Sequence, residues 1–199
     1  MQQHAMCSSS GILVLGGHPD ETADQSVEFW SPTGQSCILS NYPRKMEMGP
    51  TVDLVSDHLV ACYYHTCEIY REGSWQHLQN MTGNGGPLGR KDHNSATTKD
   101  AVLLIGGFSS TTEWIPVDGS PSQPGPFSVR RHGPGHCTIQ LSDDVIVVTG
   151  GVSNVVDPYQ YVTQYQMTDG TETPLTSLGQ PRYAHACGVY QDTNGQQVS

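Results

Sequence analysis

One short phrase of sequence recurs at a nearly fixed interval along the chain. Apolar residues run into a glycine pair at Leu13–Gly17, Leu103–Gly107 and Val147–Gly151. A weaker copy, Leu59–Cys62, carries Ala61 and Cys62 in place of the glycines. From first glycine to first glycine, with Ala61 standing in, the intervals are 45, 45 and 44 residues. A fixed period in this range is the signature of a repeat architecture.

Each copy of the phrase predicts a short buried strand, because its residues are apolar and largely β-branched without helical periodicity. The glycine pair lets the backbone turn or approach a neighbour where a Cβ would clash. A second strand, turn residues and a short outer strand follow each copy. A strand introduced by a basic residue precedes each copy, and these upstream strands are expected at Pro43–Met48, Arg90–His93, Arg131–Thr138 and Pro181–Cys187. The downstream strands are expected at Val27–Trp30, Cys67–Tyr70, Thr112–Ile115 and Thr163–Tyr165. Each repeat is therefore predicted to form four antiparallel strands.

In these features the chain resembles the kelch family of β-propellers. The resemblance is carried by three glycine pairs and by the downstream aromatic residues Phe29, Tyr70, Trp114 and Tyr165. The glycines with this structural role are Gly16, Gly17, Gly106, Gly107, Gly150 and Gly151. Phrases such as Ser26–Glu28 and Pro181–Gly188 also look like a group of kelch-like proteins of marine invertebrates. Many members of that group are extracellular, so the resemblance slightly favours that location.

The resemblance implies an all-β, kelch-type propeller in which neighbouring blades cover each other's faces. We expect a single propeller region over residues 1–199, with approximate repeats at 1–42, 43–88, 89–129 and 130–180. Residues 181–199 read as the first strand of a fifth blade, and His4–Cys7 as the first strand of the first. The expected ring is thus incomplete and typical of a fragment. Open edges of such a ring would favour self-association.

Composition narrows the possible partners. The formal net charge is −10, which argues against nucleic acid or an anionic membrane as a partner. No apolar run approaches the ~20 residues of a membrane-spanning helix, and the first residues show no signal peptide. The six cysteines lack the paired spacing of zinc sites. Cys62 and Cys67 flank a predicted hairpin, and a disulfide between them and two reduced thiols are equally compatible with the sequence.

Two motifs suggest enzymes. His18-Pro19-Asp20-Glu21 resembles the metal-binding start of zinc-dependent N-deacetylases, where His18 and a carboxylate would bind zinc. One aspartate of that motif is missing, however, and the repeat explains the preceding strand without a metal.

His4, His93, His136 and His185 fall at similar positions in successive upstream strands, and copper oxidases on kelch-like propellers use histidines near the axis. We favour the alternative that each histidine begins a strand and hydrogen-bonds a neighbouring turn.

Arginine is scarce, and four of the six arginines fall just before successive upstream strands. These are Arg44, Arg90, Arg131 and Arg182, which the resemblance would place near one mouth of a central channel. Clustered guanidinium groups suit a ligand that bears carboxylate or phosphate. Alternatively, each arginine pairs with a carboxylate of an adjacent blade. Glu28, Glu68 and Glu113 recur once per repeat as candidate partners.

The preferred function is a non-catalytic interaction module that binds a protein or glycan through loops on one face. The alternative is an enzyme on the same scaffold, a copper oxidase or, less favoured, a zinc N-deacetylase. No nucleophile, base and orienting group stand in a recognisable arrangement, and no cofactor is expected.

Overall fold

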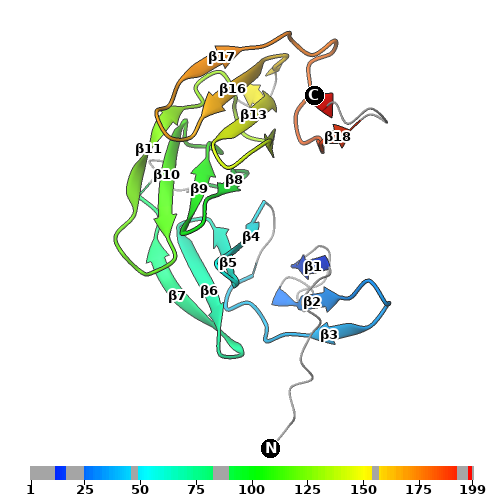
Figure 1. Cartoon of the computed structure of the whole chain (residues 1–199), viewed down its shortest axis with the longest axis vertical. Helices are drawn as coiled ribbons and strands as arrows, with labels where there is room; N and C mark the ends of the chain where they lie inside the picture. Colours follow the sequence, from blue (N-terminus) through cyan, green and yellow to red (C-terminus); the bar gives the residue numbers. More distant parts are fainter. Residues whose placement is uncertain are drawn as a thin grey trace, which may run out of the picture.

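The computed structural model describes residues 12–16, 25–45, 49–82, 90–153, 157–191 and 197–198. Every regular element within these ranges is a β-strand, and the strands form consecutive antiparallel sheets. Figure 1 shows the sheets side by side in an open arc, in the order of the sequence. The expectation of an all-β fold is confirmed. No helix in the described part of the chain is long and apolar enough to span a bilayer.

Four sheets make up the body of the arc, and we number them in chain order. Sheet 1 contains β1 (Ile12–Leu15), β2 (Val27–Trp30) and β3 (Ser36–Ile38). Sheet 2 contains β4 (Thr51–Val55), β5 (His58–Tyr63), β6 (Thr66–Arg71) and β7 (Ser74–Asn80). Sheet 3 contains β8 (Asn94–Thr97), β9 (Ala101–Ile105), β10 (Thr111–Pro116) and β11 (Gln123–Ser128). Sheet 4 contains β12 (His136–Gln140), β13 (Val145–Gly150), β16 (Val162–Gln166) and β17 (Glu172–Pro174).

Two short hairpins complete the described strands. One pairs β14 (Val152–Ser153) with β15 (Asp157–Pro158), and the other pairs β18 (Tyr190–Gln191) with β19 (Gln197–Val198). The first strand of a fifth blade, predicted within 181–199, does not form over the described part of that range. Residues 181–189 form no strand apart from a single bridge between Tyr159 and Arg182, and the hairpin follows them.

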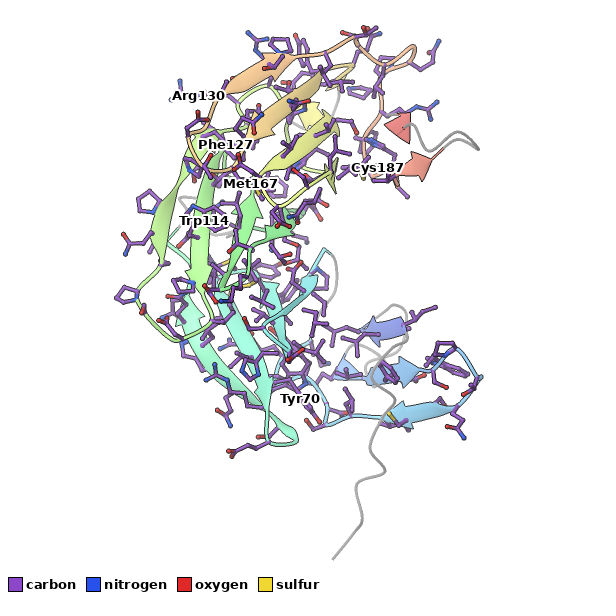
Figure 2. All side chains as sticks on the ribbon, viewed as in Figure 1. Tyr70, Trp114, Phe127, Arg130, Met167 and Cys187 are labelled. Carbon is purple, nitrogen blue, oxygen red and sulfur yellow. A yellow bond between two sulfur atoms is a disulfide. The ribbon has the colours of Figure 1, made fainter. Side chains whose placement is uncertain are left out.

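A separate hydrophobic core fills each interface between consecutive sheets. Val27 and Tyr42 pack against Ala61 and Tyr63 between sheets 1 and 2. Ile69 packs with Leu104 and Ile115 between sheets 2 and 3. Side chains of sheets 3 and 4 meet in the same way, and Figure 2 shows Phe127 and Met167 at that interface. Alternation along each strand explains this arrangement, because successive side chains point to opposite faces and so serve two cores.

The upstream strands begin later than the sequence suggested. We expected them at Pro43–Met48, at Arg90–His93 and from Arg131 onward, but they begin at Thr51, Asn94 and His136. The basic residues instead belong to turns that lead into these strands. In sheet 1 the described strands number three, and the expected first strand at His4–Cys7 lies outside the described residues.

The strand registers also correct the alignment of the second repeat. Leu104 and Val148 each stand two residues before the first glycine of their repeat. Leu104 pairs with Glu113, and Val148 pairs with Thr163. Ala61 pairs with Glu68 in the same way, so Tyr63 occupies the position of the first glycine. Ala61 is thus the counterpart of Leu104 and not of Gly106. The alignment from sequence was misleading because Ala61 and Cys62 are small and resemble a glycine pair. The residues that occupy the positions of the pair are Tyr63 and Tyr64.

Candidate ligand-binding site

In sheets 3 and 4 the first glycine of the pair makes room for a histidine of the segment that follows. A Cβ added to Gly106 would lie 2.7 Å from Cε1 of His136, and one added to Gly150 would lie 2.7 Å from Cε1 of His185. Both glycines have positive φ, 65° and 64°, which L side chains rarely adopt. The glycine and the following histidine therefore form one structural unit across an interface.

These two histidines, and His93 at the corresponding place before β8, bond to turns and neighbouring strands. Nδ1 of His136 donates to the Gly133 carbonyl at 3.0 Å, and Nδ1 of His93 bonds in the same way to the Arg90 carbonyl. Nε2 of His185 lies 2.8 Å from Oγ1 of Thr149. Burial lowers the pKa of His93 and of His136 to about 4, so both rings are neutral at pH 7. These contacts match the structural role expected of the histidines; His4 lies outside the described residues.

Four residues in left-handed conformation gather on one side of the arc, and we call them the inner turns. They are Gly49, Asp92, Gly135 and Ala184, with φ between 49° and 69°. The Ala184 amide donates to the Gly135 carbonyl at 2.7 Å, and the Gly135 amide to the Asp92 carbonyl at 3.5 Å. A Cβ on Gly49 would lie 2.8 Å from Oδ1 of Asp92. Segments from four repeats thus meet through their backbones.

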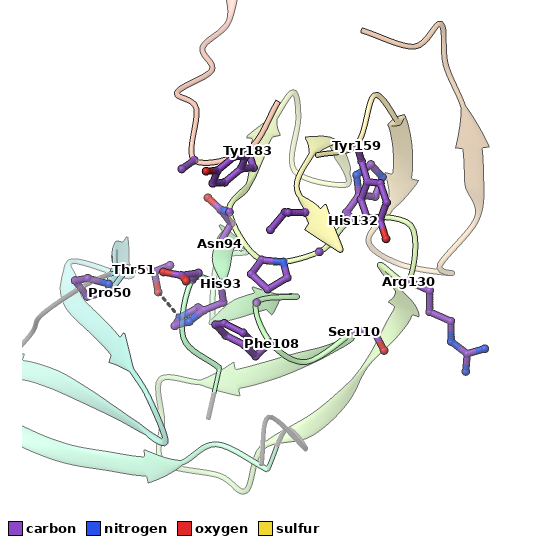
Figure 3. Close-up of a pocket in the computed structure, with 18 residues that line it drawn as sticks. Pro50, Thr51, His93, Asn94, Phe108, Ser110, Arg130, His132, Tyr159 and Tyr183 are labelled. Atoms are coloured by element: carbon purple, nitrogen blue, oxygen red, sulfur yellow. Dashed lines mark hydrogen bonds between the residues drawn. The ribbon is translucent and has the colours of Figure 1, made fainter. Parts of the chain in front are cut away.

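The inner turns line a pocket of about 800 Å³ (Figure 3). Its walls come from the entries to β4, β8 and β12, the loops after the glycine pairs, and the segment after sheet 4. Aromatic rings in these walls are contributed by Phe108, Tyr159 and Tyr183. Phe108 is 41% exposed and Tyr183 is 55% exposed, so both rings present surface to solvent. Pockets of this size and mixed lining are typical ligand sites.

Polar groups accompany the aromatic rings. Asn94, Ser110 and Arg130 line the pocket, and Asn94 donates through Nδ2 to the His136 carbonyl at 2.6 Å. His132 donates from Nδ1 to the Gly150 carbonyl at 3.1 Å, and its Nε2 lies 2.9 Å from Oγ1 of Thr163. Burial lowers the pKa of His132 to about 4 and raises that of Asp92. The histidines of the pocket wall are therefore neutral and already hydrogen-bonded, so they are better suited to a structural role than to proton transfer.

The predicted arginine cluster does not form at this pocket. Arg90 is 1% exposed and lies between sheets, with Nε 3.1 Å from Oε2 of Glu113 and its other nitrogens bonded to Thr111. Burial raises the pKa of Glu113, but hydrogen bonds from Thr82 and the charge of Arg90 outweigh it, so the pKa lies below its usual value. Arg90 therefore stabilises the fold, as the alternative reading of the arginines proposed.

The other three arginines occupy separate places. Nε of Arg44 lies 3.2 Å from Oε1 of Glu68, and the hydroxyl of Tyr42 donates to the same carboxylate. Arg131 lies 3.9 Å from Glu172 with both side chains partly exposed. Arg182 is exposed and makes no ion pair with a described residue. Of the glutamates proposed as partners, Glu68 and Glu113 receive an arginine, whereas Glu28 accepts a bond only from its neighbour Trp30 within the described residues.

His18–Glu21 and Gly17 lie outside the described residues. The remaining ranges contain no group of three His, Cys, Asp or Glu side chains placed to hold a metal ion. The cysteines have a structural role instead: Cys62 bonds to Cys67, and Cys137 bonds to Cys187. The first disulfide decides between the two alternatives left open above, and the second was not predicted.

Sequence reasoning missed Phe108, Tyr159 and Tyr183 as pocket residues. Phe108 follows directly on the glycine pair Gly106–Gly107, as Val152 follows Gly150–Gly151. That recurrence was available in the sequence. Tyr159 and Tyr183 had no such signal, because they reach the pocket through the bridge between Tyr159 and Arg182.

Comparison with known proteins supports the fold. No family model matches the sequence, and no curated protein matches it. The solved structure of YjhT superimposes with a TM-score of 0.66 at 10% sequence identity. The match covers 85% of this chain and 63% of that chain, so the present chain spans less than two thirds of YjhT. At this identity the likeness shows the all-β architecture alone.

Proposed function

We propose that this protein is a non-catalytic binding module, built as a kelch-type β-propeller region, that binds a glycan in the pocket at the inner turns. The observation that carries the proposal is the combination of two exposed aromatic rings with amide and hydroxyl groups in one concave site. Such a site offers apolar faces for the C–H faces of a sugar ring and directional groups for its hydroxyls. A flat protein surface would fit a pocket of about 800 Å³ less well.

The kelch-type assignment is supported by the repeat itself. Successive antiparallel sheets pack face to face through one core each, and glycine pairs recur at equivalent places in sheets 3 and 4. Glu68 and Glu113 occupy the same register position and each bonds an arginine from the preceding connection.

The two disulfides between described residues support an oxidising compartment for the protein. Disulfides persist in secreted and extracellular proteins and are rare in the cytosol. An extracellular glycan-binding role agrees with both the disulfides and the pocket.

Titration of the full chain with neutral and acidic oligosaccharides, followed by NMR or calorimetry, tests the proposal. Phe108→Ala and Tyr183→Ala are expected to weaken binding by about tenfold or more, since each removes a stacking surface. Ile38→Ala is the matched control, because Ile38 is 79% exposed and lies on sheet 1. Binding that is unaffected by both pocket substitutions, or absent for both classes of saccharide, would contradict the proposal.

A further inference from the structure

The outer strands of the sheets differ in how their free edges are protected. Each of β3, β7, β11 and β17 is an end strand of its sheet, and Figure 1 shows these strands along the outer side of the arc. A long edge strand is a template for pairing with another chain, and proteins prevent this with short strands, prolines or charged side chains. β3 and β17 have three residues each, and β11 contains Pro124 and Pro126. These three edges are therefore poor templates.

β7 has none of these protecting features. It has seven residues, Ser74–Asn80, and none of them is proline, lysine, arginine, aspartate or glutamate. A bulge interrupts its pairing with β6 beside Cys67, but the register from His77 back to Ser74 is regular. No described strand pairs with the other side of β7. Sheet 2 shares cores with sheets 1 and 3, so this edge lies in the middle of the arc and not at either end.

The one N-glycosylation sequon of the sequence, Asn80-Met81-Thr82, begins at the last residue of β7. A single triplet of this kind arises easily by chance, so its place in the fold decides its meaning. Asn80 is exposed, whereas Met81 is 8% exposed and its amide donates to the His65 carbonyl at 2.7 Å. The amide and the hydroxyl of Thr82 both donate to Oε1 of Glu113 at 2.7 Å. The two residues after Asn80 thus anchor the backbone, while the Asn80 side chain lies at the surface.

We propose that Asn80 carries an N-linked glycan and that this glycan covers the free edge of β7. The co-reactant is an oligosaccharide held on a lipid diphosphate in the secretory pathway. Nδ2 of Asn80 forms a bond to C1 of the first sugar and loses a proton, while the bond between C1 and the diphosphate oxygen breaks. A bulky, hydrated chain at this place blocks the approach of a second strand, as the prolines do in β11.

The disulfides agree with this modification, because they form in the same oxidising compartment in which N-glycans are added. The hydroxyl of Thr82 is part of the acceptor sequence, and in the folded protein it is bonded to Glu113. Transfer of the glycan therefore precedes the packing of sheet 3 on sheet 2. Asn80 does not line the pocket at the inner turns, so the modification is independent of the proposed binding site.

Expression of the full chain behind a signal peptide in eukaryotic cells tests the modification. The wild type is expected to lose the mass of one glycan on treatment with peptide N-glycosidase, which leaves an aspartate at position 80 that mass spectrometry detects. Asn80→Gln and Thr82→Ala are expected to abolish this mass loss. Thr82→Ser is the matched control and is expected to retain it, because serine keeps the hydroxyl of the sequon. A wild type of unchanged mass, or an Asn80→Gln protein that still loses mass, would overturn the proposal.

Sedimentation velocity before and after enzymatic deglycosylation tests the covering role. The deglycosylated wild type and Asn80→Gln are expected to associate more strongly than the glycosylated protein. Adding Gln76→Lys to Asn80→Gln is expected to reverse this association, because a charged side chain protects the edge of β7. Gln123→Lys is the matched control and is expected to leave the association unchanged, since Gln123 is exposed on β11, which already contains prolines. Equal association with and without the glycan, or equal reversal by both lysines, would contradict the covering role.

Discussion

The glycines that face a histidine of the next repeat are the residues most sensitive to substitution. Gly106→Val and Gly150→Val are expected to destabilise the protein by ~1–3 kcal/mol or more, because each adds a β-branched side chain at positive φ and against an imidazole. Thermal melting of the purified variants measures the effect. The corrected register makes Ala61→Val a packing change in a core and not a counterpart of these two. Gly34→Val is a useful control, since φ is +80° there but no atom lies within 4 Å.

Acid should destabilise the fold through its buried histidines. His93 and His136 have folded-state pKa values of about 4, compared with 6.5 in the unfolded chain. Their stabilising contribution is complete above pH 6.5 and is lost as the pH falls from 6.5 towards 4, by up to about 3 kcal/mol for each histidine. The melting temperature is therefore expected to drop over this interval.

Protonation of Asp53 is expected to act against the loss of stability that protonation of the histidines causes. Burial raises the pKa of Asp53 to about 6, although the bond from Ser95 acts in the other direction. Its protonation therefore stabilises the folded state as the pH falls from 6 towards 3.8. Asp53→Asn is expected to make the acid loss steeper, whereas His136→Gln should flatten it. A melting temperature that is independent of pH between 7 and 4.5 in all three proteins would contradict both assignments.

At the scale of elements, the disulfide between Cys137 and Cys187 joins β12 of sheet 4 to the segment after that sheet. It closes a loop with a sequence separation of 50, whereas Cys62 and Cys67 are separated by 5 within one hairpin. Cys187→Ser is expected to cost about 4 kcal/mol and Cys67→Ser about 2 kcal/mol on the chain-entropy estimate. Chemical denaturation compares the two variants.

The longer disulfide also holds part of the pocket. Tyr183 and Ala184 lie on the segment that Cys187 anchors, so Cys187→Ser is expected to expose the chain near Arg182 to trypsin. The Cys67→Ser variant should show no increased cleavage there. Equal cleavage in both variants would show that hydrogen bonds, such as that from the Ala184 amide to Gly135, are sufficient to hold the segment.

The sequence predicted some elements well and others poorly. The strands of the glycine phrase and the strands downstream of them were located correctly, because apolar β-branched runs and turn residues bound them on both sides. The upstream strands were placed too early, since β8 reads Asn-Ser-Ala-Thr and has no apolar alternation to distinguish it from the preceding turn. The pocket could not be predicted from spacing, because its walls come from four repeats and depend on inner turns that include Asp92 and Ala184 as well as glycine.

For the whole molecule, stability is expected to follow the order of the sheets. Among the described residues, sheets 2 and 3 share cores with neighbours on both faces, whereas sheet 1 shares a core with sheet 2 alone. In repeat proteins the stability of each unit depends on its own contacts and those with its nearest neighbours. Native-state hydrogen exchange is therefore expected to show faster exchange for β1 and β2 than for β9 and β10. Uniform protection across these strands would indicate one cooperative unit instead.

The glycine–histidine units also give the repeats an adjacency rule. In sheets 3 and 4 the second strand leads into a glycine, Gly106 or Gly150, that faces the histidine of the segment that follows. In sheet 2 Tyr63 stands at this position, and Nε2 of the following His93 lies 3.2 Å from Oγ1 of Thr51. A repeat whose histidine packs against a glycine can therefore be placed behind Gly106 or Gly150, whereas sheet 2 offers Tyr63 at that position and bonds the incoming histidine through its own Thr51. An engineer who shuffles or duplicates these repeats has to treat each junction, and not each repeat, as the interchangeable part.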